Sequence, residues 1–134
     1  MNKRRLALIL AVIAVVCFTL TACSKPKNLE EFAAKNSDFQ KEMSDIEEQN
    51  AGLKIAFKEN TVIFTYDVSN VAGVTESTAT SDAVKANLNQ SLESATSTFE
   101  SKVKEISEET GYDGIKIQVI YTYKDTELAS KTFG

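Results

Sequence analysis

Glutamates are the side chains of this sequence that offer the most chemistry. They occur as pairs at Glu30-Glu31 and Glu47-Glu48, and as a group at Glu105, Glu108 and Glu109. Two carboxyls about 5–9 Å apart in a cleft can hydrolyse a glycosidic bond, and clustered oxygens can hold a divalent cation. These glutamates all lie in segments of helical periodicity, beside or opposite the apolar stripe, where charged residues face solvent. We therefore expect no catalytic residue and no metal site among them.

Other catalytic signatures are missing from the sequence. The chain has no histidine, which excludes Ser-His and Cys-His nucleophiles and histidine-containing zinc sites. Its five glycines form no G-x-x-x-x-G-K pattern that would cradle a phosphate. A formal net charge of −4 leaves no basic patch for nucleic acid. We expect no cofactor and no nucleic-acid partner.

Tyrosines are the remaining candidates, because exposed tyrosine is a common anchor in binding surfaces. Tyr66, Tyr121 and Tyr123 stand at strand spacing and can form a ladder across a sheet. If they face helices they belong to the core, which is the simpler interpretation. If the strand register turns some of them outward, they form a candidate binding surface. The Ser/Thr-rich segment 69–80 is a second candidate, and a mobile polar connector is its simpler interpretation.

The N-terminal segment has the features of an export signal. Lys3, Arg4 and Arg5 precede an uncharged run from Leu6 to Leu20, and the run is shorter than the roughly 18 residues of a membrane-spanning helix. The exit, Leu20-Thr21-Ala22-Cys23, resembles the lipobox of bacterial lipoproteins, whose cysteine thiol carries diacylglycerol and becomes the first residue after cleavage. We expect residues 1–22 to be removed and Cys23 to hold the protein on the outer, extracytoplasmic face of the cell membrane. A short transmembrane anchor is the alternative.

The chain after this leader has the size of one domain. Removal of residues 1–22 leaves 112 residues, with 23–28 as the lipidated tether and 29–134 as the folded part. Three positive charges leave with the leader, so the net charge falls from −4 to −7. Cys17 leaves as well and Cys23 is lipidated, so the fold is expected to have no disulfide.

Periodicity places the elements of this domain. Asn28 caps a helical pattern over 29–50 that is interrupted at Asn36-Ser37, where Ser37 and Gln40 can cap a fresh start. Alternation over 53–58 and 62–68 predicts a hairpin with its turn near Glu59-Asn60. A long amphipathic helix is predicted from Ser81 or Asp82 to Thr110, with a bend near 96–98 and a stop at Gly111. Strands are predicted over 115–124 and 128–133.

The order α-β-β-α-β-β predicts a particular layered fold. Each helix has one apolar stripe and the strands have one dominant apolar face. The economical arrangement is an α+β two-layer sandwich, an antiparallel four-stranded sheet with two helices on one face.

Several of these features together resemble a known group of proteins. The lipobox, the opening Asn28-Leu29-Glu30-Glu31-Phe32, the long second helix and the ending Tyr123-Lys124-Asp125-Thr126-Glu127-Leu128 are similar to small lipoproteins of Gram-positive bacteria that carry a domain of unknown function. The resemblance implies an envelope location and a compact α+β domain. It implies no substrate and no site residue beyond the lipidated cysteine.

The function expected from these features is a non-enzymatic binding or accessory module of the cell envelope. The lipid bilayer is its partner through the anchor, and an envelope protein or wall component is its partner through the sheet face or segment 69–80. A cell-wall-active enzyme using a carboxylate pair is the first alternative. A small-ligand carrier for a transporter is the second, although the chain is small for the two-lobed cleft of such carriers.

Overall fold

The computed structural model describes residues 26–134. The predicted leader and Cys23 lie outside the described residues. The elements are α2 (Leu29–Lys35), α3 (Ser37–Gln49), β1 (Leu53–Lys58), β2 (Thr61–Asp67), the 3₁₀ turn η1 (Val68–Asn70), α4 (Glu76–Ala79), α5 (Asp82–Ser94), α6 (Thr96–Thr110), β3 (Lys116–Tyr123) and β4 (Thr126–Phe133).

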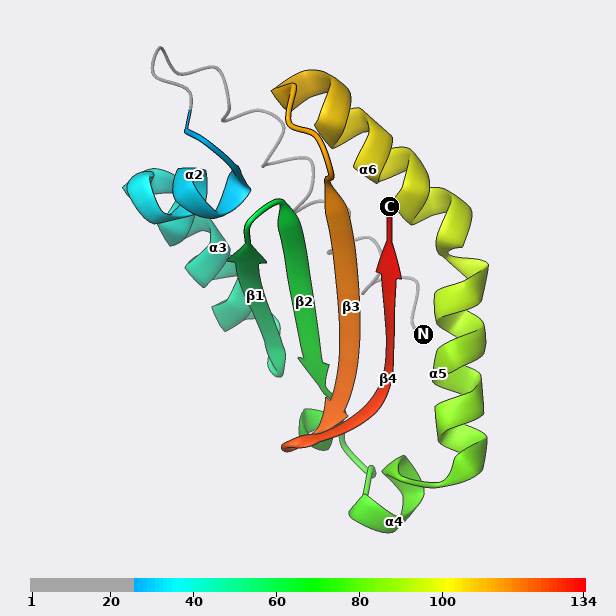
Figure 1. The fold of residues 1–134 in the computed structure, drawn as a ribbon. Coiled ribbons are helices and arrows are strands. Elements are labelled where there is room, and N and C mark those ends of the chain that lie inside the picture. Colours follow the sequence, from blue (N-terminus) through cyan, green and yellow to red (C-terminus); the bar gives the residue numbers. More distant parts are fainter. Residues whose placement is uncertain (1–25) are drawn as a thin grey trace.

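The four strands form one mixed sheet in the order β1-β2-β3-β4 (Figure 1). The α+β class is confirmed, but the prediction of an antiparallel sheet is wrong, because β2 and β3 are parallel, with Thr61 opposite Lys116. The helices between these strands explain the difference. The 13 residues of α5 and 15 of α6 each extend about 20 Å and return the chain to the end of the sheet where β2 began. β3 then starts beside the start of β2, since its Lys116 N–H donates to Asn60 O at 3.0 Å.

Five α-helices form over the described residues, where the predicted sandwich had two, the first of them interrupted. The predicted interruption near Asn36 separates α2 from α3. Its cap is Asn36 rather than Ser37, because Asn36 Oδ1 accepts the Phe39 N–H at 2.9 Å. Gln40 Nε2 donates to Ala33 O at 2.7 Å, which closes the end of α2. Asn28 caps α2 as predicted, with Glu31 N–H donating to its Oδ1 at 2.9 Å.

The predicted long helix is divided at Ala95, one residue before the segment where a bend was expected. Ala95 has φ −89° and ψ −1°, away from the regular helical values. Its N–H is shared between Ser91 O and Leu92 O, both at 3.2 Å. The second half ends as predicted at Gly111, whose φ of 72° lies in the left-handed region that favours glycine.

The strand register places one row of apolar side chains across the sheet. Phe57, Val62, Ile117 and Phe133 are successive partners in this row. Phe57 at one edge contacts the ring of Phe39 on α3, with centroids 5.5 Å apart. Phe133 at the other edge stacks on Phe99 of α6, with centroids 4.6 Å apart. The aromatic contacts therefore fasten a helix to each edge of the sheet.

A polar junction at the β1–β2 turn joins three segments that are distant in the sequence. Leu29 N–H, at the start of α2, donates to Asn60 Oδ1 at 3.1 Å. Asn60 Nδ2 donates to Asp113 O, just before β3, at 2.8 Å. The neighbouring turn residue Glu59 exchanges two bonds with Glu30, through Glu30 N–H to Glu59 O at 2.9 Å and Glu59 N–H to Glu30 Oε2 at 2.6 Å. We call these contacts the Asn60 junction.

Substituting Asn60→Ala tests the junction. The change removes both side-chain bonds and leaves the Leu29 N–H without its acceptor, so we expect a loss of about 1–3 kcal/mol of unfolding free energy. Urea unfolding of the variant measures this loss. The control is Asn89→Ala, at an exposed position on α5, which should change stability by less than about 0.5 kcal/mol. Equal effects from the two variants would contradict a structural role for the junction.

Candidate functional site

Two of the predicted carboxylate groups bind backbone along the edge strand β1. Glu47 Oε1 accepts the Ile55 N–H at 3.0 Å, and Glu47 Oε2 lies 3.8 Å from Lys54 Nζ. Glu30 accepts the Glu59 N–H, as described above. Side chains that occupy the outward N–H groups of an edge strand protect it from pairing with another chain. These glutamates therefore have a structural task that the sequence pattern did not reveal.

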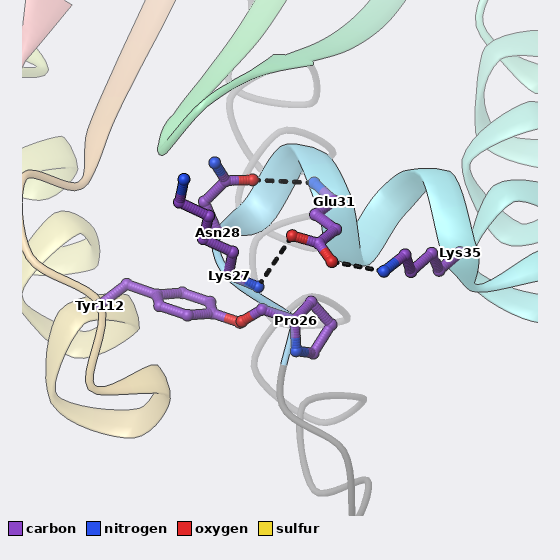
Figure 2. A network of polar contacts seen from close by, with 6 residues as sticks. All are labelled: Pro26, Lys27, Asn28, Glu31, Lys35 and Tyr112. Carbon is purple, nitrogen blue, oxygen red and sulfur yellow. Dashed lines mark hydrogen bonds and ion pairs between the residues drawn. The ribbon is translucent and has the colours of Figure 1, made fainter.

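Glu31 organises the segment that enters the domain (Figure 2). Its carboxylate pairs with Lys35 Nζ and accepts the Lys27 N–H at 3.1 Å. The hydrogen bond from Lys35, with that from the Lys27 backbone, holds the pKa of Glu31 below its usual value. Close by, Tyr112 Oη donates to Pro26 O. Burial, and then the negative charge of Glu31, raises the pKa of Tyr112.

The third group of glutamates lies on α6 and forms local ion pairs. Glu105 is 2.8 Å from Lys102 and Glu108 is 3.9 Å from Lys104. Such surface pairs within one helix contribute about a few tenths of a kcal/mol. Between residues 26 and 134, no three His, Cys, Asp or Glu side chains come together as metal ligands.

The three predicted tyrosines lie on the side of the sheet that faces the core. Tyr66 pairs with Tyr121 across β2 and β3, and their rings meet edge to face with centroids 6.3 Å apart. Tyr121 is only 3% exposed, whereas Tyr66 and Tyr123 are partly buried and pack against the core. Lys124 Nζ lies 5.7 Å from the Tyr123 ring centroid. Binding through these tyrosines stays a prediction, and only their partly exposed members offer surface for it.

Segment 69–80 has more helical structure and more apolar contacts than its Ser/Thr-rich sequence suggested. It contains η1 and α4, and Val68 and Ala79 at its borders are buried. Thr75 caps α4 by accepting the Thr78 N–H at 3.3 Å. Between this segment and α5 lies a pocket of about 180 Å³, lined by Val68, Val71, Val74, Thr78, Ala79, Val84 and Leu88.

The pocket was missed in the sequence because serine and threonine dominate the segment around it. The signal that could have found it is the spacing of Val68, Val71 and Val74, which recur every three residues as on one side of a helical turn. Its lining is apolar apart from Thr78. An apolar cavity of about 150 Å³ can take up a benzene-sized group. This pocket therefore has room for one aliphatic or aromatic side chain, or a ligand of that size.

Asp67 ties the strand ends beside this pocket. Its Oδ1 accepts the Ser69 N–H at 2.9 Å and the Lys124 N–H at 3.0 Å, which links β2 to the β3–β4 turn. Burial acts to raise the pKa of Asp67, but the hydrogen bonds from Ser69 and Lys124 outweigh it. The pKa therefore lies below the usual value of 3.8.

This lowered pKa predicts how stability responds to acid. The charged Asp67 stabilises the fold above about pH 4, and this contribution is lost as the pH falls through the lower folded-state pKa. Asp67→Asn should be about 1 kcal/mol less stable than the natural chain at pH 7, and the difference should shrink towards pH 3. Urea unfolding at several pH values measures it, with Asp45→Asn on α3 as the control for loss of one charge. A gap that stays constant or widens in acid would show that Asp67 does not act in this way.

Between Pro26 and Gly134, no helix combines the length and apolar character needed to cross a bilayer. Comparison with protein families matches residues 29–133 to a domain of unknown function, DUF4854. No curated protein and no solved structure matches the chain. Because the match spans the strands, the Asn60 junction and the pocket, the chain belongs to the DUF4854 family.

Proposed function

We propose that this protein is a lipid-anchored lipoprotein of the bacterial cell envelope that acts as a binding module rather than an enzyme. The anchor is Cys23 on the outer face of the membrane, in line with the resemblance to lipoproteins of Gram-positive bacteria. The binding site is the apolar pocket beneath segment 69–80. Its partner is an envelope protein or wall component that inserts one apolar group.

The observation that carries the proposal is the separation of the pocket from the linker. Pro26 and the start of α2 lie at the end of the sheet that holds the Asn60 junction, whereas α4 lies at the opposite end (Figure 1). The seven residues of β2 place these ends about 20 Å apart. The pocket therefore lies at the end of the sheet away from Pro26, where the described chain begins.

The carboxylates support a binding role over an enzymatic one. Catalysis by a carboxylate pair needs two acids that converge on one substrate. Glu30 and Glu47 instead accept backbone N–H groups of separate residues of the β1 edge and its turn, and Glu31 accepts from Lys35 and Lys27. A small-ligand carrier remains the second candidate, because the pocket has the volume for a single small apolar group.

Photo-crosslinking in cells tests the pocket. A photoreactive residue at exposed Ser77 should capture one partner. Val71→Asp places a charge among the pocket's apolar side chains, and we expect it to lower the yield at least tenfold, since a buried unpaired charge costs more than about 1.4 kcal/mol. Ala72→Asp is the matched control, at the next, exposed residue outside the lining. Loss of the adduct in both variants, or in neither, would contradict binding through the pocket.

The anchor has its own readout in the same cells. Cys23→Ala should move the protein from the membrane to the soluble fraction. Two acyl chains hold a protein stably on a bilayer, and the variant has no cysteine to carry them. The mass of the natural chain should show diacylglycerol on its first residue. A soluble natural chain would overturn the anchor without bearing on the pocket.

A further inference from the structure

Over residues 26–134, no helix lies on the face of the sheet that points away from the core. In Figure 1 the strands lie uncovered on the near side, and α3 passes behind β1. Because side chains alternate along a strand, the residues of this face can be assigned from the register. We call them the open face: Lys54, Ala56 and Lys58 on β1, Thr61, Ile63, Thr65 and Asp67 on β2, Lys116, Gln118, Ile120 and Thr122 on β3, and Glu127, Ser130 and Thr132 on β4.

Two isoleucines occupy the centre of this polar face. Ile63 lies opposite Gln118, and Ile120 lies opposite Thr65. Both are partly buried, yet they belong neither to the buried core nor to the apolar side chains that pack against it. Together they give the otherwise polar face an apolar centre, which a second molecule can cover.

The charges of the open face are divided between its ends. Lys116 stands at the end that holds the Asn60 junction. Asp67 and Glu127 stand at the other end, where both are partners of Thr122 on β3. The six residue steps from Lys116 to Thr122 separate the two ends by about 20 Å. Lys58, which pairs with Thr61, adds a second positive charge at the Lys116 end, and Lys54, which pairs with Thr65 on the edge strand, lies towards the acidic end. Apart from Lys54, the face is therefore basic at one end and acidic at the other.

We propose that the open face binds the open face of a second copy of this chain, with the strands of the two copies antiparallel. A two-fold interface brings the same patch of both copies together, so a patch with opposite charges at its ends is complementary to itself when one copy is reversed. The two-fold axis lies between the two sheets, runs perpendicular to the strands and crosses β2 midway between Ile63 and Thr65. Lys116 then lies over the partner's Thr122. That position is flanked by the partner's Asp67 and the partner's Glu127.

The same axis makes the centres of the two open faces complementary to each other. Ile63 lies over the partner's Thr65, and Ile120 lies over the partner's Gln118. Each isoleucine thus meets a different, more polar side chain rather than its own copy. The four isoleucines of the pair become neighbours in one apolar centre, and packed sheets are spaced about 10 Å apart, which side chains of this size can fill.

The opposite relative orientation is disfavoured by charge. With the strands of the two copies parallel, the basic ends would meet each other and so would the acidic ends. The antiparallel pair brings together like charges only at the β1 edge, where Lys54 approaches the partner's Lys58. Lys54 is 78% exposed at that edge and has Glu47 3.8 Å away, so this contact is screened.

Crosslinking of the full chain in its native membranes tests the pairing. A photoreactive residue in place of Ile120 should give an adduct of twice the chain mass, joined to β2 or β3 of the second copy. An adduct with a different protein, or no adduct between copies, would overturn the proposal. The Cys23→Ala experiment and the crosslinking from Ser77 use other positions. Their outcome is therefore independent of this one.

A charge exchange provides the sharper test. Lys116→Glu and Glu127→Lys should each lower the yield of the paired adduct roughly threefold or more. Glu127→Lys removes one ion pair with Lys116 on each side of the two-fold interface, and Lys116→Glu removes that pair and the contact with the partner's Asp67. The double variant should recover part of the yield, because the exchanged charges attract each other again while a carboxylate at position 116 still faces the partner's Asp67. Within one chain these positions lie at opposite ends of the sheet, so a rescue can only arise between copies.

Glu100→Lys and Lys104→Glu, at exposed positions on α6, are the matched controls. They should leave the yield of the paired adduct unchanged. Thermal melting of every variant checks that its fold is intact. A double variant that pairs no better than the single ones, with its fold intact, would contradict the antiparallel arrangement.

Discussion

The side-chain amide of Asn60 holds together the three segments that determine the layout of this domain. Its oxygen accepts from the first residue of α2 and its nitrogen donates to the loop before β3. Its own carbonyl accepts the Lys116 N–H that opens the parallel β2–β3 pair. One turn residue therefore links the start of α2, the loop before β3 and the first bond of the parallel β2–β3 pair. A hydrophobic core alone is non-directional and would not set these positions.

Charged residues in this acidic domain mainly serve its architecture. Glu30 and Glu47 occupy backbone donors of the β1 edge and its turn, and Asp67 fastens the far end of β2 to the β3–β4 turn. Both ends of the sheet are thus closed by side chains that accept backbone N–H groups. The apolar pocket and the open face are not closed by such contacts. The proposed envelope partner binds at the pocket, and the proposed second copy binds at the open face.

Local pattern predicted most elements but not their pairing. Alternation and capping located the first hairpin, the break at Asn36 and the stop at Gly111, because these depend on neighbouring residues. Alternation is the same for a parallel and an antiparallel neighbour, so the β2–β3 pair could not be predicted from it. The tyrosine face depended on a register that only the folded sheet settles. The pocket was missed because its valines lie in a Ser/Thr-rich segment and meet α5 only through tertiary packing.

Residue-resolved amide hydrogen exchange of the natural chain tests the role of Asn60 most directly. We expect the Leu29, Glu30 and Lys116 N–H groups of the Asn60 junction to exchange as slowly as those at the centre of β2 and β3. Amides of residues 69–80 should exchange faster, as expected for a binding segment at the less stable end of a domain. Fast exchange at the junction, together with slow exchange over 69–80, would contradict the claim that Asn60 holds the linker end and leaves the pocket end to bind.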